Sequence, residues 1–448
     1  MTETLERTVG TRAIVVVPVL KRLPGDERGQ GVSPRLTRSP DARLEEAVGL
    51  TEAIALDPVQ TEIVVVNDPR PATLLGTGKV EEIADAVKEK EAELVIVDHP
   101  LTPVQQRNLE KAFNAKVLDR TGLILEIFGE RARTKEGVLQ VELAHLNYQK
   151  GRLVRSWTHL ERQRGGAGFL GGPGETQIEA DRRMLQEKII RLKRELETVR
   201  RTRDLHRAKR RKVPFPVVAI VGYTNAGKST LFNRLTGSGV LAEDMLFATL
   251  DPTLRRLRLP HGTTVILSDT VGFISDLPTH LIAAFRATLE EVVEADLIVH
   301  LRDISDPDTA VQAEDVEQIL RDLGVDPHDS NRVIEVWNKI DQIDQTDRER
   351  LLRQSRADRP APAIGISAVT GEGVPALAER IEELLSGALA QFDVVLRPDQ
   401  MGMIDWVYRN GDVVDRADEE DGSVRLTIST TRDSRKAIET RLGRVSEN

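Results

Sequence analysis

The sequence of 448 residues contains no cysteine, which excludes disulfide bonds and thiolate metal sites as a source of stability. It also lacks any run approaching the roughly 18 consecutive apolar residues that a membrane span requires. The first residues do not have the profile of a signal peptide. Together these absences predict a soluble, cytoplasmic protein without a membrane span.

The length and the charge distribution indicate several domains and one basic element. At about 150 residues per domain, 448 residues suggest three domains, and 40% hydrophobic residues are enough for their cores. The net charge is −9, yet residues 182–212 hold fourteen Lys or Arg against four Asp or Glu, a local charge of +10. Such asymmetry is typical of an element that contacts a phosphate backbone, although a solvated helix face is the alternative.

Apolar strands alternate with helical patterns near the N-terminus. The strands are expected at residues 13–17, 62–66, 94–97 and 116–118, and the helices between them at 44–56, 79–90 and 103–113. This alternation predicts a small parallel α/β domain over residues 1–135. Residues 76–79, Gly-Thr-Gly-Lys, lack the spacing of a phosphate loop and favour a plain turn before a helix.

Two apolar stripes with heptad-like spacing follow. The first contains Leu139, Leu143, Leu146, Leu153, Trp157 and Leu160, and the second contains Leu185, Ile189, Leu192, Leu196 and Val199. They predict an antiparallel helical hairpin over residues 136–212. Six glycines within residues 164–174 predict a loop at its tip, because each glycine costs a helix about 1 kcal/mol. Phe169 and Leu170 in this loop suit contact with a partner, the alternative being a flexible connector.

A phosphate-binding loop is expected at residues 222–229. The sequence Gly222, Tyr223, Thr224, Asn225, Ala226, Gly227, Lys228, Ser229 fits G-x-x-x-x-G-K-[ST] and lies between an apolar run and a helical pattern. Backbone N–H groups of this loop would face the phosphates, with the Lys228 charge near the β and γ oxygens. The Ser229 hydroxyl could ligate Mg²⁺.

Three further motifs follow at suitable distances within a predicted GTPase domain, residues 213–388. They are Asp269, Thr270, Val271, Gly272; then Asn338, Lys339, Ile340, Asp341; then Ser367, Ala368, Val369. Asp269 could hold the magnesium shell and Gly272 could donate its N–H to the γ-phosphate. The Asp341 carboxylate can accept from N1–H and the 2-amino group of guanine, whereas adenine would leave it unpaired. A backbone N–H at residues 367–368 could reach guanine O6, so we expect a site for GTP and GDP.

The tail, residues 389–448, is predicted to be a small α+β domain. Strands are expected at 394–396 and 424–429, and helices at 401–409 and 431–442. The acidic residues 418–422 between the strands favour a solvated hairpin turn over a metal site.

Several strings together resemble the HflX family of bacterial GTPases. They are Gly-Gly-Pro-Gly-Glu-Thr-Gln at 171–177, Val-Leu-Asp-Arg-Thr at 117–121, Leu-Gln-Val-Glu-Leu-Ala at 139–144, Phe-Ala-Thr-Leu-Asp at 247–251 and Asp-Thr-Val-Gly-Phe at 269–273, with the phosphate loop above. The resemblance implies an N-terminal α/β domain with a helical hairpin, a Ras-like P-loop GTPase domain and a small C-terminal domain.

The resemblance also implies a partner and a function. Members of such a family bind the large ribosomal subunit, with ribosomal RNA contacts by the basic hairpin and the Gly-rich tip, and split stalled or stress-arrested ribosomes. We expect a monomer. Alternatives are a regulatory switch acting on a non-ribosomal protein and an RNA-remodelling enzyme with a second nucleotide site in the N-terminal domain.

The family pattern assigns further site residues. The segment Phe247, Ala248, Thr249, Leu250, Asp251 matches a nucleotide-contacting switch in which Thr249 joins Ser229 on Mg²⁺, with Thr253 as the competing choice. Asn225 matches a residue that holds K⁺ in several related GTPases, a loop-stabilising role being the alternative. Lys228, Thr249, Gly272 and Asn225 are thus the expected catalytic residues.

One departure from Ras-like proteins concerns catalysis. The position of the glutamine that orients the attacking water is Phe273, whose ring cannot hydrogen-bond water. We therefore expect slow intrinsic turnover and stimulation by a partner, with the ribosome as the natural candidate.

Overall fold

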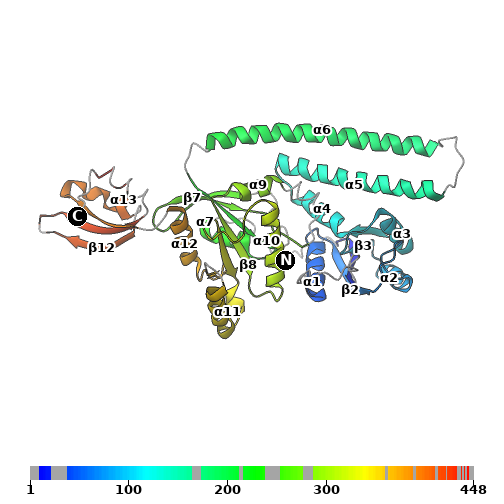
Figure 1. The fold of residues 1–448 in the computed structure, drawn as a ribbon, viewed down its shortest axis with the longest axis horizontal. Helices are drawn as coiled ribbons and strands as arrows, with labels where there is room; N and C mark the ends of the chain where they lie inside the picture. Colours follow the sequence, from blue (N-terminus) through cyan, green and yellow to red (C-terminus); the bar gives the residue numbers. More distant parts are fainter. Residues whose placement is uncertain are drawn as a thin grey trace, which may run out of the picture. The chain divides into compact units, whose positions relative to one another are not determined.

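The structure is a computed structural model, drawn in Figure 1. It describes residues 10–21, 38–163, 173–210, 215–237, 253–275, 286–358, 362–386, 390–408, 412–419, 421–430, 435, 438 and 441–442. The chain forms two compact units. The first comprises residues 1–210 with 243–251 and 275–287, and the second comprises 211–242, 252–274 and 288–448. Within the described residues, no helix is both long and apolar enough to cross a membrane.

The first unit begins with a four-stranded parallel sheet in the order β2-β1-β3-β4. Its strands are β1 (Arg12–Leu20), β2 (Asp57–Val66), β3 (Leu94–Val97) and β4 (Lys116–Asp119). The helices between them are α1 (Pro40–Glu52), α2 (Thr77–Glu89) and α3 (Pro103–Phe113). Residues 13–17 of β1 are fully buried, as expected for a central parallel strand covered on both faces. The predicted parallel α/β architecture is confirmed.

The segment around Gly76 forms the predicted turn before a helix. Gly76 is the N-cap of α2, and Lys79 one turn later is ion-paired with Glu62 and Glu82. Hydrogen bonds to these carboxylates raise the pKa of Lys79, with Glu62 contributing most. Lys79 therefore serves an ion-pair network on the surface of the domain.

An additional helix, α4 (Arg120–Arg131), follows β4 and was not expected from the sequence. Asp119 caps it by accepting from the Gly122 N–H at 2.8 Å. Arg120 is buried and donates to Asp98 at 2.5 Å and to Glu46 at 2.7 Å. These charge-assisted bonds join α1, α4 and the end of β3.

Two long helices, α5 (Lys135–Gln163) and α6 (Pro173–Arg210), run side by side in Figure 1. They pack through a cluster drawn from the two predicted stripes: Leu139, Leu143, Leu146, Leu185, Ile189, Leu192, Leu196 and Val199. Helix α6 starts at Pro173, so the loop predicted to run to Gly174 ends two residues earlier, because proline suits the first helical position. The rest of that tip, and the side chains of Leu153, Trp157 and Leu160, lie outside the described residues.

The second unit contains a six-stranded sheet in the order β10-β9-β8-β5-β7-β6. The strands are β5 (Val217–Gly222), β6 (Thr253–Arg258), β7 (Thr264–Asp269), β8 (Leu297–Asp303), β9 (Val333–Asn338) and β10 (Ile364–Gly365). Only β6 is antiparallel to its neighbour. The helices are α7 (Lys228–Thr236), α9 (Arg286–Glu294), α10 (Thr309–Asp322), α11 (Gln345–Asp358) and α12 (Val374–Ser386). The carboxyl ends of the parallel strands therefore meet at one edge, where ligands bind in open α/β sheets.

The C-terminal part of this unit is a three-stranded antiparallel sheet in the order β11-β13-β12. Its elements are β11 (Ala390–Leu396), the 3₁₀ helix η2 (Pro398–Met403), α13 (Ile404–Tyr408), β12 (Asp412–Asp418) and β13 (Val424–Thr430). Strand β12 was not expected, and the helix predicted at 401–409 is divided between η2 and α13. Most of the helix predicted at 431–442 lies outside the described residues.

The acidic residues after β12 form the predicted hairpin turn. The Glu419 N–H donates to the Ser423 carbonyl at 2.9 Å, and the Asp421 carboxylate accepts from the Ser423 N–H at 2.9 Å. The Ser423 hydroxyl also donates to this carboxylate at 2.5 Å, and the hydroxyl first, then the N–H, lowers the pKa of Asp421. The carboxylate thus stabilises its own turn.

Candidate nucleotide-binding site

The predicted phosphate loop joins β5 to α7. Gly222 ends the strand and Gly227 is the N-cap of the helix, which begins at Lys228. Asn225 and Gly227 have positive φ angles of 61° and 92°. A Cβ on Gly222 would stand 2.2 Å from the Leu301 carbonyl oxygen, so the strand end admits only glycine. The loop thus leads into a helix N-terminus, and the N–H groups and dipole at such an end favour an anion.

Lys228 is buried at the start of α7. Its Nζ donates to the Tyr223 carbonyl at 2.7 Å. Burial lowers the pKa of Lys228 to about 8, and the neighbouring Asp269 carboxylate opposes this shift. A phosphate group beside Nζ would favour the protonated form, so the loop is electrostatically suited to a polyphosphate.

Ser229 and Asp269 lie together beside the loop. The Ser229 hydroxyl donates to Asp269 Oδ2 at 2.8 Å, and Asp269 is fully buried at the end of β7. Hydroxyl and carboxylate oxygens are the hard ligands that Mg²⁺ prefers, and Mg²⁺ usually takes one or two of them together with substrate phosphates. This donor set fits Mg²⁺. Within the described ranges, no group of three or more His, Asp or Glu forms a separate metal cage.

The segment after Asp269 continues alongside the phosphate loop. The Thr224 N–H donates to the Phe273 carbonyl at 2.7 Å, and the Phe273 N–H donates to the Gly222 carbonyl at 3.0 Å. A Cβ on Gly272 would lie 3.0 Å from Nζ of Lys228, so this glycine allows the backbone to approach the lysine closely. Phe273 itself is only 2% exposed and belongs to the core.

Asn338, the last residue of β9, joins two loops. Its Nδ2 donates to the Ala226 carbonyl at 2.8 Å, and its Oδ1 accepts from the Ala368 N–H at 2.9 Å. A Cβ on Gly227 would stand 2.2 Å from Nδ2 of Asn338. We expected a backbone N–H at residues 367–368 to be available for guanine O6, yet the Ala368 N–H is engaged by Asn338 and the Ser367 N–H donates to the Glu372 carbonyl at 2.9 Å.

The other residues of the third motif leave a carboxylate accessible. Lys339 has a φ of 63°, and the 3₁₀ helix η1 (Ile340–Gln342) follows it. Lys339 Nζ pairs with Asp303 Oδ2 at 2.7 Å, whereas Asp341 is exposed. The kink thus presents Asp341 at the surface, where a base could reach it.

Two functional candidates were missed from the sequence. Asp303 ends β8 next to the strand of Asn338, and the rule that polar residues at adjacent strand ends meet could have identified it. Arg234 on α7 donates from Nε to the Ala368 carbonyl at 2.6 Å, across 134 residues. No local pattern in the sequence indicates that contact.

The switch segment predicted at 247–251, with Thr249, lies outside the described residues. Thr253, the competing choice, is the first residue of β6 and is paired with Asp269 in the sheet register. The role of Thr249 therefore stays a prediction.

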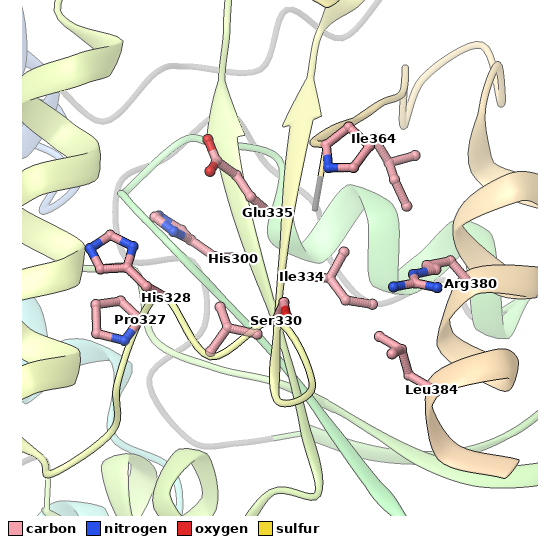
Figure 2. A pocket seen from close by; sticks show the side chains of 11 residues that line it. His300, Pro327, His328, Ser330, Ile334, Glu335, Ile364, Arg380 and Leu384 are labelled. Atoms are coloured by element: carbon pink, nitrogen blue, oxygen red, sulfur yellow. The ribbon is translucent and has the colours of Figure 1, made fainter. Parts of the chain in front are cut away.

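A separate cavity of about 400 Å³ lies elsewhere in the second unit and is shown in Figure 2. Apolar side chains of β9, β10 and α12 and two prolines line it together with the polar or charged residues His300, His328, Ser330, Glu335 and Arg380. The residues of the four motifs do not line it. The candidate site is therefore located by the motif geometry at the carboxyl edge of the sheet.

Family comparisons cover most of the chain. Residues 41–129 match the model "GTP-binding GTPase N-terminal", residues 131–210 match "GTP-binding GTPase Middle Region", residues 217–339 match "50S ribosome-binding GTPase", and residues 353–448 match "HflX C-terminal domain".

Curated relatives match over a similar extent. The GTPase HflX of Magnetococcus marinus is 53% identical over 369 residues, covering 82% of this chain and 83% of the relative. The GTPase HflX of Escherichia coli is 45% identical over 385 residues, covering 86% and 89%. The GTPase HflX of Lacrimispora saccharolytica is 45% identical over 381 residues, covering 85% and 86%. The chain therefore belongs to the HflX family of GTPases.

Proposed function

We propose that this GTPase binds GTP and GDP at the described site, hydrolyses GTP with Mg²⁺, and acts in the cytoplasm as a monomer that splits stalled or stress-arrested ribosomes. The observation that carries the nucleotide part is the double hydrogen bond of Asn338, which joins the phosphate loop to the Ser367–Ala368 loop. The loop proposed to bind the phosphates and the loop proposed to read the base are thereby joined by one side chain.

Each residue has a proposed part in this chemistry. The backbone of 222–227 and Lys228 bind the β and γ phosphates, and the Gly272 N–H contacts the γ-phosphate. Ser229 and Asp269 hold Mg²⁺, directly or through its water shell, with Thr249 as the second hydroxyl. The metal, when bound, neutralises charge that develops on the phosphate oxygens. Asp341 reads the N1–H and 2-amino edge of guanine.

Asn225 is proposed to hold K⁺ near the phosphates. Its positive φ of 61° places it in the left-handed region, which asparagine tolerates better than most residues. Comparing GTP turnover in K⁺ and in Na⁺ tests this role, and an Asn225→Gly variant, which tolerates the same backbone angle, should lose any K⁺ dependence while retaining GDP binding. Equal turnover in both ions would return Asn225 to a loop-stabilising role.

Slow intrinsic hydrolysis is part of the proposal, because Phe273 is buried and cannot orient water. A partner would have to order the attacking water or supply the missing group. Turnover measured with and without purified large ribosomal subunits tests this, and a rate that the subunits leave unchanged would contradict it.

The ribosomal part is supported by the match of residues 217–339 to a model named for 50S ribosome binding, and by the +10 charge of residues 182–212. Cosedimentation with purified subunits should show more binding with a non-hydrolysable GTP analogue than with GDP. Splitting is then measured as conversion of 70S particles into subunits.

A charge-neutralised variant identifies the contacting helix. Replacing Arg200, Arg201, Arg207 and Arg210 with Gln should weaken binding and flatten its salt dependence. Replacing only Arg200 and Arg201 gives a two-charge variant, and its matched control replaces Arg350 and Arg353 on α11, which are exposed and lie in the other unit. Equal subunit binding and equal salt dependence in the two variants would favour a solvated helix face.

If the wild-type protein binds no ribosomal subunit at all, the switch acting on a non-ribosomal partner is favoured.

A further inference from the structure

Arg234 on α7 contacts the loop that follows Ser367. Its Nε donates to the Ala368 carbonyl at 2.6 Å, and its Nη2 donates to the Val369 carbonyl. The same helix begins at Lys228, two turns earlier, in the phosphate-binding loop. One helix therefore ties the phosphate-binding loop to the loop proposed to read guanine.

Gly371 makes this contact possible. A Cβ at this position would stand 2.7 Å from Nη1 of Arg234, and the residue has a φ of 93°. Glycine therefore provides both the left-handed backbone and the space for the guanidinium. The loop is otherwise closed on itself, since the Gly371 N–H donates to the Ser367 carbonyl at 2.8 Å and the Thr370 N–H to Ser367 Oγ at 3.0 Å.

The two carbonyl contacts determine where the intervening N–H group points. In a trans peptide the C=O and the following N–H lie on opposite sides. The described residues contain no cis peptide bond. With the Ala368 carbonyl directed at Arg234, the Val369 N–H must point away from α7.

The N–H groups on either side of Val369 are already hydrogen-bonded within the protein, so the Val369 N–H is the candidate donor to the base. The Ala368 N–H is engaged by Asn338 at 2.9 Å, and the Thr370 N–H by Ser367. Val369 is 68% exposed, the highest value among the large hydrophobic residues that the structure describes as exposed. An apolar side chain next to a directed N–H is suited to a planar purine with a carbonyl at its edge.

We infer that Arg234 is a positioning residue for guanine specificity, which acts by directing the Val369 N–H toward O6 of the base. The inference rests on the proposed nucleotide site and adds a residue that contacts neither base nor phosphate. Arg234 thereby affects the O6 side of the base, whereas Asp341 reads the opposite 2-amino side.

The test separates these two sides with nucleotide analogues. IDP lacks the 2-amino group and retains O6. 6-Thio-GDP retains N1–H and the 2-amino group and carries sulfur, a weaker acceptor, in place of O6. Dissociation constants for GDP, IDP, 6-thio-GDP and ADP are measured on the full chain with Mg²⁺, for wild type, Arg234→Ala, Arg234→Lys and the control Arg321→Ala. Arg321 is a partly exposed arginine on α10 that pairs with Glu317.

Arg234→Ala should weaken GDP binding about five- to tenfold, the size of one neutral hydrogen bond, mainly through faster release. The preference for GDP over 6-thio-GDP should fall by a similar factor, while the preference for GDP over IDP stays unchanged. The GDP affinity of Arg234→Lys, which retains a donor, should lie between those of wild type and Arg234→Ala. This variant also provides the test if Arg234→Ala folds poorly. Arg321→Ala should match wild type.

Equal weakening of GDP and 6-thio-GDP in both Arg234 variants would overturn the inference, because a purely structural role affects all purines alike. So would unchanged GDP binding in Arg234→Ala. Failure of the proposed function looks different, since wild type itself would then show no preference for GDP over ADP.

Discussion

The Asn338 side chain donates to the backbone carbonyl of Ala226, 112 residues earlier in the chain, at 2.8 Å. Asn338 is 2% exposed and Ala226 is fully buried, so the bond is shielded from water. The same side chain accepts from the Ala368 N–H. One amide therefore satisfies a donor and an acceptor from two different loops.

Replacing Asn338 with alanine should impair binding and stability together. The change leaves the Ala226 carbonyl and the Ala368 N–H without their partner, at about 1–3 kcal/mol for each buried group. We expect GDP and GTP affinity to fall at least about tenfold in fluorescent-nucleotide titrations. Asn331→Ala, an exposed residue in the loop before β9, is the matched control. Undiminished affinity in Asn338→Ala would show that the loops are held by other contacts.

Nucleotide binding should take up a proton at alkaline pH. Burial lowers the Lys228 pKa from 10.5 to about 8, so the free protein has largely lost this proton at pH 9, whereas bound phosphates favour the ammonium form. Affinity should therefore fall as pH rises above about 8. Calorimetry of GDP binding at pH 9 in two buffers of different ionisation enthalpy should reveal the uptake, and the uptake should nearly vanish at pH 7.

The same shift affects the stability of the nucleotide-free protein with the opposite sign. Between about pH 8 and 10.5 the unfolded chain binds more protons at Lys228 than the folded chain does. The unfolding free energy contributed by this group should thus rise with pH in that window. Urea titrations at a series of pH values give the unfolding free energy of wild type and of Lys228→Met. The difference between the two proteins should change with pH only between about pH 8 and 10.5, and a constant difference would contradict the lowered pKa.

Local patterns predicted the parts of this structure that depend on sequence neighbours. The four strands of the N-terminal sheet follow their apolar runs, and the stripes through Leu139 and Ile189 meet in the hairpin as expected. Helix α4 was missed because its first turn contains Gly122, and glycine is a poor helix former. Strand β12 was missed because Asp412, Asp415 and Asp418 conceal the apolar alternation.

The site was predictable in its motifs and not in its cross-connections. The residue types at 222–229, 269–272 and 338–341 carry their own chemistry, so spacing alone identified them. Asn338 accepts from the Ala368 N–H because of its position in the folded sheet, and the sequence alone does not give that position. The contact of Arg234 depends on a helix packing against a loop 134 residues away. Both are properties of the tertiary fold.

Asp341→Asn should change the nucleotide preference. An amide donor suits the 2-carbonyl of xanthine and cannot accept both N1–H and the 2-amino hydrogens of guanine. We expect weaker GTP binding and tighter binding of xanthosine triphosphate, measured by competition against a fluorescent nucleotide. Asp344→Asn, a nearby carboxylate outside the motif, controls for charge. An unchanged preference in Asp341→Asn would mean that the base is read by other groups.

The helical hairpin offers two adjacent isoleucines with opposite environments. Ile189 is 2% exposed within the cluster between α5 and α6, whereas Ile190 is 42% exposed. Ile189→Ala should destabilise the hairpin by about 2–4 kcal/mol, because it removes a buried side chain and leaves a cavity. Ile190→Ala should cost less than about 1 kcal/mol. Hydrogen exchange of the α5 and α6 amides measures both effects. GDP affinity should stay unchanged in both variants, since the phosphate loop, Asn338 and the loop after Ser367 belong to the other unit. Equal acceleration of exchange in the two variants would mean that the helices do not pack through the predicted stripes.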